Sequence, residues 1–164
     1  MVKKEKSKFG IMDVARLVGI QPTLLNKFIQ RGKYGIRASV RAGEGHGRQR
    51  FFGEADLYGI ALVYWLFESG LRSEAIQYVL NQICGGRLRS SANDAASNVP
   101  RQTNQMLVIT REARTGFAKY PKQEATFMDA ELISVIVSEN QIGLIVIIPV
   151  GRLYAFLREE METK

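Results

Sequence analysis

Few side chains in this sequence have the type and spacing needed to catalyse a reaction or to hold a metal ion. His46 is the only histidine and Cys84 the only cysteine, so neither has the partners of a catalytic pair or a zinc site. The glycine-rich run 43–47 lacks the Gly-Lys-Ser/Thr ending of a phosphate-binding loop. We therefore expect no enzymatic activity, no cofactor and no metal. We expect His46 to lie in an exposed loop and Cys84 to be a small buried apolar side chain.

Asp56 and a cluster of aromatic residues have structural interpretations as well as chemical ones. Asp56 stands near the start of a predicted helix, where a carboxylate favours the positive end of the helix dipole. That position predicts a helix-start anion rather than a catalytic acid. Trp65, with Tyr64 and Phe67, fits a core or a subunit interface better than an aromatic cage for a cationic ligand.

The basic residues are concentrated in the first half of the chain. The net charge is +7, but residues 1–90 hold 15 lysines and arginines against 7 acidic residues, a net +8. This split indicates a module that binds a polyanion, joined to a neutral half. Nucleic acid is the leading candidate for the polyanion. The alternatives are that the basic surface binds anionic lipid, or that it serves only solubility.

The composition also bears on the compartment. A single cysteine suits a reducing compartment, and we expect a cytoplasmic, nucleoid-associated protein. The basic start has no long apolar run behind it, and the most apolar stretch, residues 142–150, is too short to span a bilayer. We therefore expect no association with a membrane.

The first half of the sequence predicts short helices around a hairpin. After a basic, mobile arm over residues 1–9, helices are expected at 12–18 and from Pro22 to about Arg31, separated by Gly19. Two short helices around a glycine turn are typical of a helix-turn-helix. Residues 36–52 predict a β-hairpin, a wing, with a glycine-rich tip. Helices follow over 54–69 and from Ser73, which can cap the second, to 83.

The second half predicts a separate small unit. Residues 85–105 are small, polar and turn-rich, which indicates a flexible linker. Beyond it, strands at 106–110, 117–120 and 142–148 and helices at 129–139 and 151–162 give the order β-β-α-β-α. The predicted fold class is α+β: a winged head over residues 10–84, the linker, and a C-terminal α/β domain over 106–164.

Three runs in the first half together resemble the MerR family of winged helix-turn-helix transcription regulators. Residues 14–28 (Val-Ala-Arg-Leu-Val-Gly-Ile-Gln-Pro-Thr-Leu-Leu-Asn-Lys-Phe), followed by Gly32, are similar to the helix-turn-helix of the family. Residues 50–57 (Arg-Phe-Phe-Gly-Glu-Ala-Asp-Leu) stand where its wing closes. Residues 70–76 (Gly-Leu-Arg-Ser-Glu-Ala-Ile) stand where its next helix pair is joined. The resemblance covers about residues 10–83, roughly half of the chain.

The chain departs from the family pattern at three places. Asn26 and Lys27 replace an Arg-Tyr pair of the recognition helix, and Phe52 replaces a tyrosine of the wing. After Cys84, two glycines and a polar run replace the long dimerising helix. The cysteine clusters of metal-sensing members are missing, so metal sensing of that kind is not expected.

The resemblance implies a DNA interface built on residues 21–31 in the major groove, with the wing on phosphates. Asparagine and glutamine can pair with adenine, and lysine favours guanine or phosphate. The implied base-contacting candidates are Gln21, Thr23, Asn26, Lys27 and Gln30. The implied phosphate-contacting candidates are Arg16, Arg37, Arg41, Arg48 and Arg50.

The sequence therefore favours a transcriptional regulator that binds double-stranded DNA as a homodimer. Its C-terminal domain would dimerise, or bind an unknown effector or protein partner. Two other hypotheses stay open. One is a DNA-architectural factor of the excisionase or partition kind. The other is a protein-interaction module whose basic head binds DNA only weakly.

Overall fold

The computed structural model describes residues 8–41, 50–112, 123–129 and 142–163. Two short helices come first in this part of the chain. They are α1 (Ile11–Val18) and α2 (Pro22–Gln30), joined through Gly19, whose φ of 77° lies in the left-handed region. Glycine adopts that conformation without the clash that a Cβ atom would cause. Proline starts α2 because it has no N–H group to leave unpaired in the first turn. The predicted bounds of both helices are confirmed to within a residue or so.

A short antiparallel pair of strands follows α2. After the single turn η1 (Lys33–Gly35), β1 (Val40–Arg41) pairs with β2 (Arg50–Phe51). The tip between the two strands, residues 42–49, lies outside the described residues. Phe9 bridges to Phe52 through two backbone hydrogen bonds of 3.0 and 2.9 Å and is buried. The predicted mobile arm over 1–9 is therefore wrong at Phe9, because this apolar side chain packs into the core.

The next two helices supply much of the apolar core. α3 (Glu54–Glu68) is buried on more than one side, as its nearly continuous apolar sequence predicted. α4 (Ser73–Ile83) has Arg72, not the predicted Ser73, at its N-cap, and no side chain caps it. The Ser73 hydroxyl lies 2.9 Å from the hydroxyl of Tyr34 instead.

A short helix lies within the segment, residues 85–105, that the sequence predicted to be a flexible linker. In α5 (Ala92–Ser97), Ser91 Oγ accepts the Asp94 N–H at 3.1 Å, and Ala92, Ala95 and Ala96 are buried. Gly59 of α3 allows this close approach, since a Cβ atom there would lie 3.0 Å from the Ala92 backbone. Small residues over 92–97 thus serve close packing between helices rather than flexibility.

Three antiparallel strands form the sheet of the second half, in the order β4-β3-β5. They are β3 (Gln105–Glu112), β4 (Gln123–Asp129) and β5 (Ile142–Ile148), and α7 (Val150–Glu162) follows β5 directly. The predicted strands at 106–110 and 142–148 and the last helix are confirmed. The predicted strand at 117–120 and nearly all of the predicted helix at 129–139 lie outside the described residues. Asp129 itself ends β4, so a helix does not begin there.

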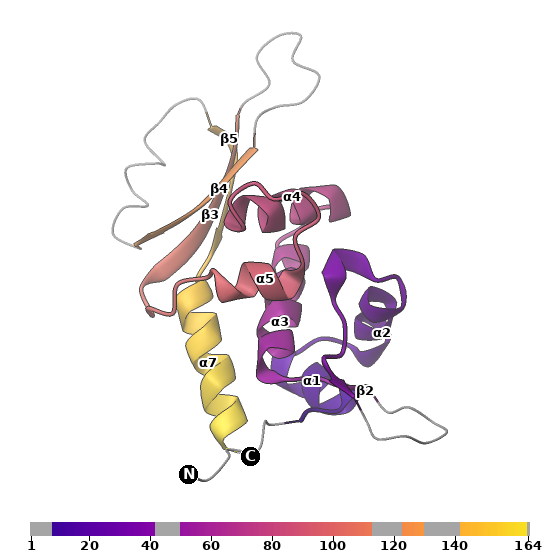
Figure 1. Ribbon diagram of the computed structural model, residues 1–164. Helices are drawn as coiled ribbons and strands as arrows, with labels where there is room; N and C mark the ends of the chain where they lie inside the picture. The colour runs from indigo at the N-terminus through magenta and orange to yellow at the C-terminus, as the bar shows by residue number, and fades with distance from the viewer. Residues whose placement is uncertain (1–7, 42–49, 113–122, 130–141, 164) are drawn as a thin grey trace.

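The described residues therefore form a mixed α+β fold, so the predicted class is confirmed at the level of α+β alone. They contain six α-helices, the β1–β2 pair and the three-stranded sheet. One continuous hydrophobic core joins residues of both halves, among them Leu25, Leu57, Leu107 and Leu157. α7 packs beside α3, while α2 lies on the other side of α3 (Figure 1). No helix of the described ranges is both long and apolar enough to cross a bilayer.

Stacked side chains join α7 to α3. The Arg101 guanidinium lies 4.2 Å from the ring centroid of Tyr58 and 4.9 Å from that of Tyr154. The two rings are 4.8 Å apart, and Trp65 lies 5.4 Å from Tyr154. The Tyr154 hydroxyl donates to the carbonyl of Tyr58 at 3.3 Å. A cation over aromatic faces is attracted by the negative face of each ring, so this cluster stabilises the contact between the halves.

Burial of Tyr154 predicts a loss of stability in alkali. Burial raises the pKa of Tyr154 above its usual value of 10.0, since an ionised ring would lose its hydration. An unfolded tyrosine ionises near pH 10, so the stabilisation is complete below pH 10 and falls as the pH rises further. At pH 11 we expect ionisation of this tyrosine in the unfolded state to lower the free energy of unfolding by about 1.4 kcal/mol. The free energy of unfolding, measured with urea, should fall less between pH 8 and pH 11 for Tyr154→Phe than for the wild type. Equal losses would contradict this explanation.

Candidate nucleic-acid interface

α2 presents a polar face to solvent. Of the five residues predicted to contact bases, Gln21, Thr23, Lys27 and Gln30 are exposed, and Asn26 is half-buried. Residues three or four apart on a helix share a face, so Thr23, Lys27 and Gln30 line one side with Asn26 beside them. Leu25 and Phe28 are buried on the opposite side. The structure therefore brings Thr23, Asn26, Lys27 and Gln30 together on one side of α2, whereas Gln21 is the N-cap before the helix.

An aromatic cluster fixes the orientation of α2. The Phe28 ring meets Tyr34 edge-on at 5.9 Å and Phe67 at 5.8 Å, which ties α2 to η1 and α3. Tyr34 has a φ of 58°, rare for a residue with a side chain, and its hydroxyl lies 2.9 Å from Ser73 Oγ. The sequence pattern did not predict this role of Tyr34, because a single residue in the left-handed conformation leaves no periodic signal.

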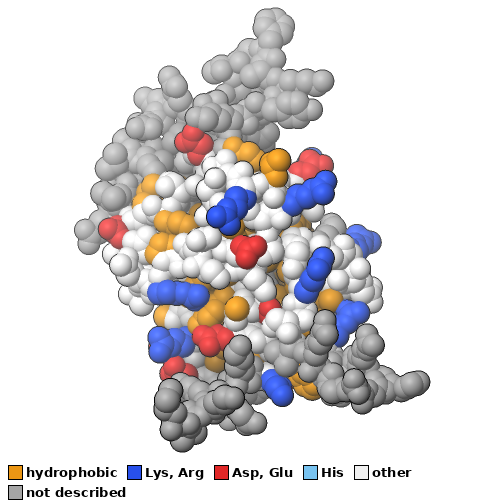
Figure 2. Space-filling model, viewed as in Figure 1, with side chains coloured by type: hydrophobic (Ala, Val, Ile, Leu, Met, Phe, Trp, Pro, Cys, Tyr) orange, Lys and Arg blue, Asp and Glu red, His pale blue; other side chains and the backbone are white. Residues whose placement is uncertain are grey.

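Exposed basic side chains lie on α2 and on elements that precede or follow it in the first half. Arg16 on α1, Arg37 after η1 and Arg50 on β2 are exposed, and so is Arg31 at the C-cap of α2, which sequence analysis did not include. The backbone of Arg41 lies in β1 opposite Arg50, but its side chain and the whole of Arg48 are outside the described residues. Several lysine and arginine side chains lie over the side of the molecule that carries α2 (Figure 2). This side is therefore suited to a polyanion.

Asp56 holds together the elements next to this surface. It is 1% exposed and lies in the first turn of α3, where its Oδ2 accepts the N–H groups of Gly53 at 2.8 Å and Ser39 at 3.0 Å. The Ser39 hydroxyl also donates to Oδ2, and Asn93 Nδ2 donates to Oδ1 at 2.6 Å. The prediction that Asp56 is a helix-start anion is confirmed. It also fastens the segment before β1, and α5, to the start of α3.

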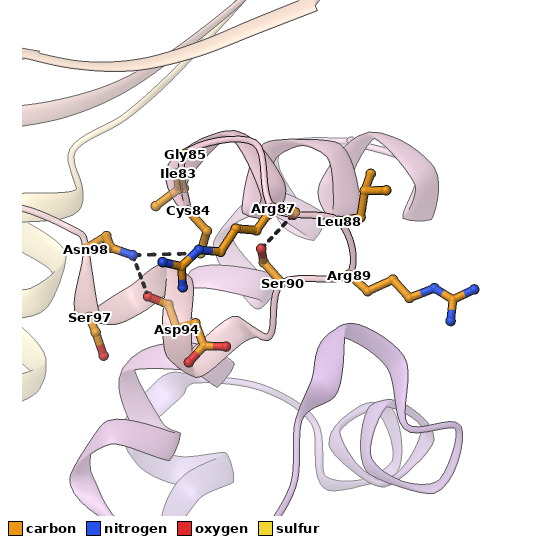
Figure 3. Close-up of a pocket in the computed structure, with 10 residues that line it drawn as sticks. All are labelled: Ile83, Cys84, Gly85, Arg87, Leu88, Arg89, Ser90, Asp94, Ser97 and Asn98. Atoms are coloured by element: carbon orange, nitrogen blue, oxygen red, sulfur yellow. Dashed lines mark hydrogen bonds between the residues drawn. The ribbon is translucent and has the colours of Figure 1, made fainter.

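A surface pocket of about 480 Å³ lies at the junction of α4 and α5 (Figure 3). Arg87 lies across it toward Asp94 and Asn98, and Asn98 Nδ2 lies 3.8 Å from Cys84 Sγ. Cys84 is half-buried in the wall of this pocket rather than buried as expected. The described residues contain no group of three histidine, cysteine or acidic side chains arranged to bind a metal ion, and His46 lies outside them.

Comparison with known proteins gives no assignment for the chain. No protein-family model matches it, and a search of curated proteins gives no significant match.

Proposed function

We propose that the protein is a sequence-specific DNA-binding transcriptional regulator of the winged helix-turn-helix kind, similar to the MerR family in its first half. α2 would enter the major groove, and the β1–β2 wing would lie on the neighbouring phosphates. The observation that carries the proposal is the exposed face of α2, where amide, hydroxyl and ammonium groups stand side by side with no carboxylate among them. Such groups can read the edges of bases, whereas a surface meant only for solubility commonly mixes both signs of charge.

The arrangement around α2 supports this proposal. The exposed arginines 16, 37 and 50 lie on α1, after η1 and on β2, and α1 and η1 both contact α2. Phosphate contacts of this kind position a protein on the duplex, while contacts to base edges give specificity. One such head makes few base contacts. We therefore include a homodimer in the proposal, with two heads about 34 Å apart on a two-fold symmetric site. The second half of the chain would supply dimerisation or bind an effector.

Replacement of Asn26 by alanine tests the proposed reading of bases. A preferred duplex is first selected from a random pool with the full chain. Asn26→Ala should then bind this duplex about 10- to 100-fold more weakly, since a good amide–base pair contributes about 1–3 kcal/mol of discrimination. Binding to a scrambled duplex should change little. Fluorescence anisotropy at physiological salt measures both affinities.

Lys27→Ala and Arg152→Ala form a matched pair of controls for charge. Each removes one exposed positive charge, but Lys27 lies on α2 and Arg152 on α7, on the other side of α3. Only Lys27→Ala should weaken binding. If the wild type shows no preference over random duplex, or if Asn26→Ala binds as the wild type does, the proposed function is wrong.

A further inference from the structure

The turn between α4 and α5 is held in place by a set of hydrogen bonds to α4. Asn81 Oδ1 accepts the Ser90 N–H at 3.0 Å, and Gln77 Nε2 donates to the Ser90 carbonyl at 2.9 Å. The Ser90 hydroxyl closes the turn on the Arg87 carbonyl at 2.8 Å. Arg89 has a φ of 58°, in the left-handed region that residues with a side chain rarely adopt. Residues 87–89 therefore have a fixed conformation, which we call the 87–89 turn.

The 87–89 turn directs an apolar and a basic side chain away from the fold. Leu88 is 87% exposed, more than any other large hydrophobic residue in the described ranges. Arg89 extends away from the body of the molecule, whereas Arg87 folds back across the pocket (Figure 3). Within the described ranges, Arg89 forms no ion pair and no hydrogen bond through its side chain. Neither Leu88 nor the Arg89 side chain thus contributes visibly to the packing of the fold, although the backbone that carries them is well fixed.

This turn lies beside the proposed DNA-binding surface. Gly35 of η1 packs directly on Ser91, since a Cβ atom at Gly35 would lie 2.7 Å from Ser91 Cβ. η1 begins two residues after the α2 C-cap, Arg31, and contacts both α2 and α5, so the turn lies near the segment that follows α2. Arg89 extends over the side of the molecule on which α2 lies (Figure 3). A duplex with α2 in its major groove would present its next stretch of backbone and minor groove close to this end.

We infer that Leu88 and Arg89 form a second DNA-contacting element, which engages the minor groove next to the contact of α2. Arg89 binds a backbone phosphate, and Leu88 enters the groove as an apolar wedge that partly unstacks one base step and bends the duplex. Proteins that bend DNA from the minor groove use exposed leucine, isoleucine, methionine or phenylalanine side chains in this way, supported by nearby arginines or lysines. The inference rests on the proposed function, because it needs α2 on the same duplex.

The wedge is tested with Leu88→Ala in the full chain. The probe is the selected duplex, used intact and with a single mismatch beside the α2 site, where unstacking is easier. Leu88→Ala should bind the intact duplex about 10-fold more weakly and recover most of this loss on the mismatched duplex. In a circular-permutation mobility shift, the wild type should bend the duplex and Leu88→Ala should bend it less. Because Leu88 is exposed, the thermal midpoint of the variant should equal that of the wild type.

The arginine is tested through the salt dependence of binding. Each phosphate contact contributes about 0.9 to the slope of log K against log salt concentration. Arg89→Ala should reduce the slope by about that amount. Arg87→Ala is the matched control, since it removes the same charge from the same turn but its side chain folds back across the pocket. Its slope should stay at the wild-type value.

The outcomes separate this inference from the proposed function. If Asn26→Ala loses selectivity while Leu88→Ala bends DNA like the wild type, the wedge is wrong and the regulator stands. If Arg89→Ala and Arg87→Ala give equal slopes, the phosphate contact is wrong. If the wild type selects no duplex at all, the proposed function fails first, and the inference falls with it.

Discussion

Replacing Asp56 with alanine is expected to lower the free energy of unfolding by about 3–5 kcal/mol, because it leaves several buried hydrogen-bond donors without an acceptor. The carboxylate is 1% exposed and accepts hydrogen bonds from Gly53, Asn93 and both the N–H and the hydroxyl of Ser39. Alanine would leave these donors facing a small void that has no acceptor. A buried donor without a partner costs about 1–3 kcal/mol, because it has given up water without replacing it.

Urea unfolding followed by circular dichroism measures this loss. Glu54→Ala is the matched control, because Glu54 is an exposed carboxylate in the first turn of the same helix. Its loss should be at most about 1 kcal/mol, the usual contribution of a charge near an exposed helix terminus. Asp56→Asn should fall between the two, since the amide keeps one acceptor but turns an NH₂ group toward a donor. If Asp56→Ala were no less stable than Glu54→Ala, the network would have no role in stability.

The position of Asp56 could be predicted from the sequence, but its partners could not. An acidic residue three positions after a glycine, at the start of an apolar run, identifies the first turn of a helix. Ser39 and Asn93 lie 17 and 37 residues away along the chain and reach Asp56 only through the tertiary fold. The same limit applies to Tyr34, which contacts Phe28 from a left-handed backbone conformation that the sequence does not reveal.

α5 shows where composition is misleading. Residues 91–97 are all small or polar, as in a flexible linker, and sequence analysis predicted one. The signal for a helix was Ser91, followed three residues later by Asp94, and three alanines that recur with helical spacing. Alanine buries little area by itself. What makes the packing favourable is the matching gap at Gly59, which no local pattern reveals. On α2, by contrast, the apolar and polar faces could be predicted from the sequence, because the apolar residues recur with the period of an α-helix.

Tyr154→Ala is expected to destabilise the whole described fold by about 3–5 kcal/mol, as truncation of a large buried aromatic side chain does. The ring is 2% exposed and packs between Tyr58 and Trp65, with Arg101 over its face. Removing it leaves a cavity between α3 and α7. It also removes one of the two aromatic rings that the Arg101 guanidinium contacts. Tyr154→Phe keeps the ring and loses only the hydroxyl bond to the Tyr58 carbonyl, so its loss should be about 1 kcal/mol.

The same variant tests whether the second half is integral to the first or merely tethered to it. Trp65, the only tryptophan, reports on the α3–α7 contact by fluorescence, and amide hydrogen exchange at Leu25 reports on α2. In one continuous core, Tyr154→Ala should speed the slowest exchange at Leu25 by the factor that matches the loss seen by fluorescence. Phe156→Ala, on the same helix but 56% exposed, should change neither probe. A tethered second half would instead leave exchange at Leu25 unchanged while the fluorescence midpoint fell. The stability of α2 would then be independent of α7.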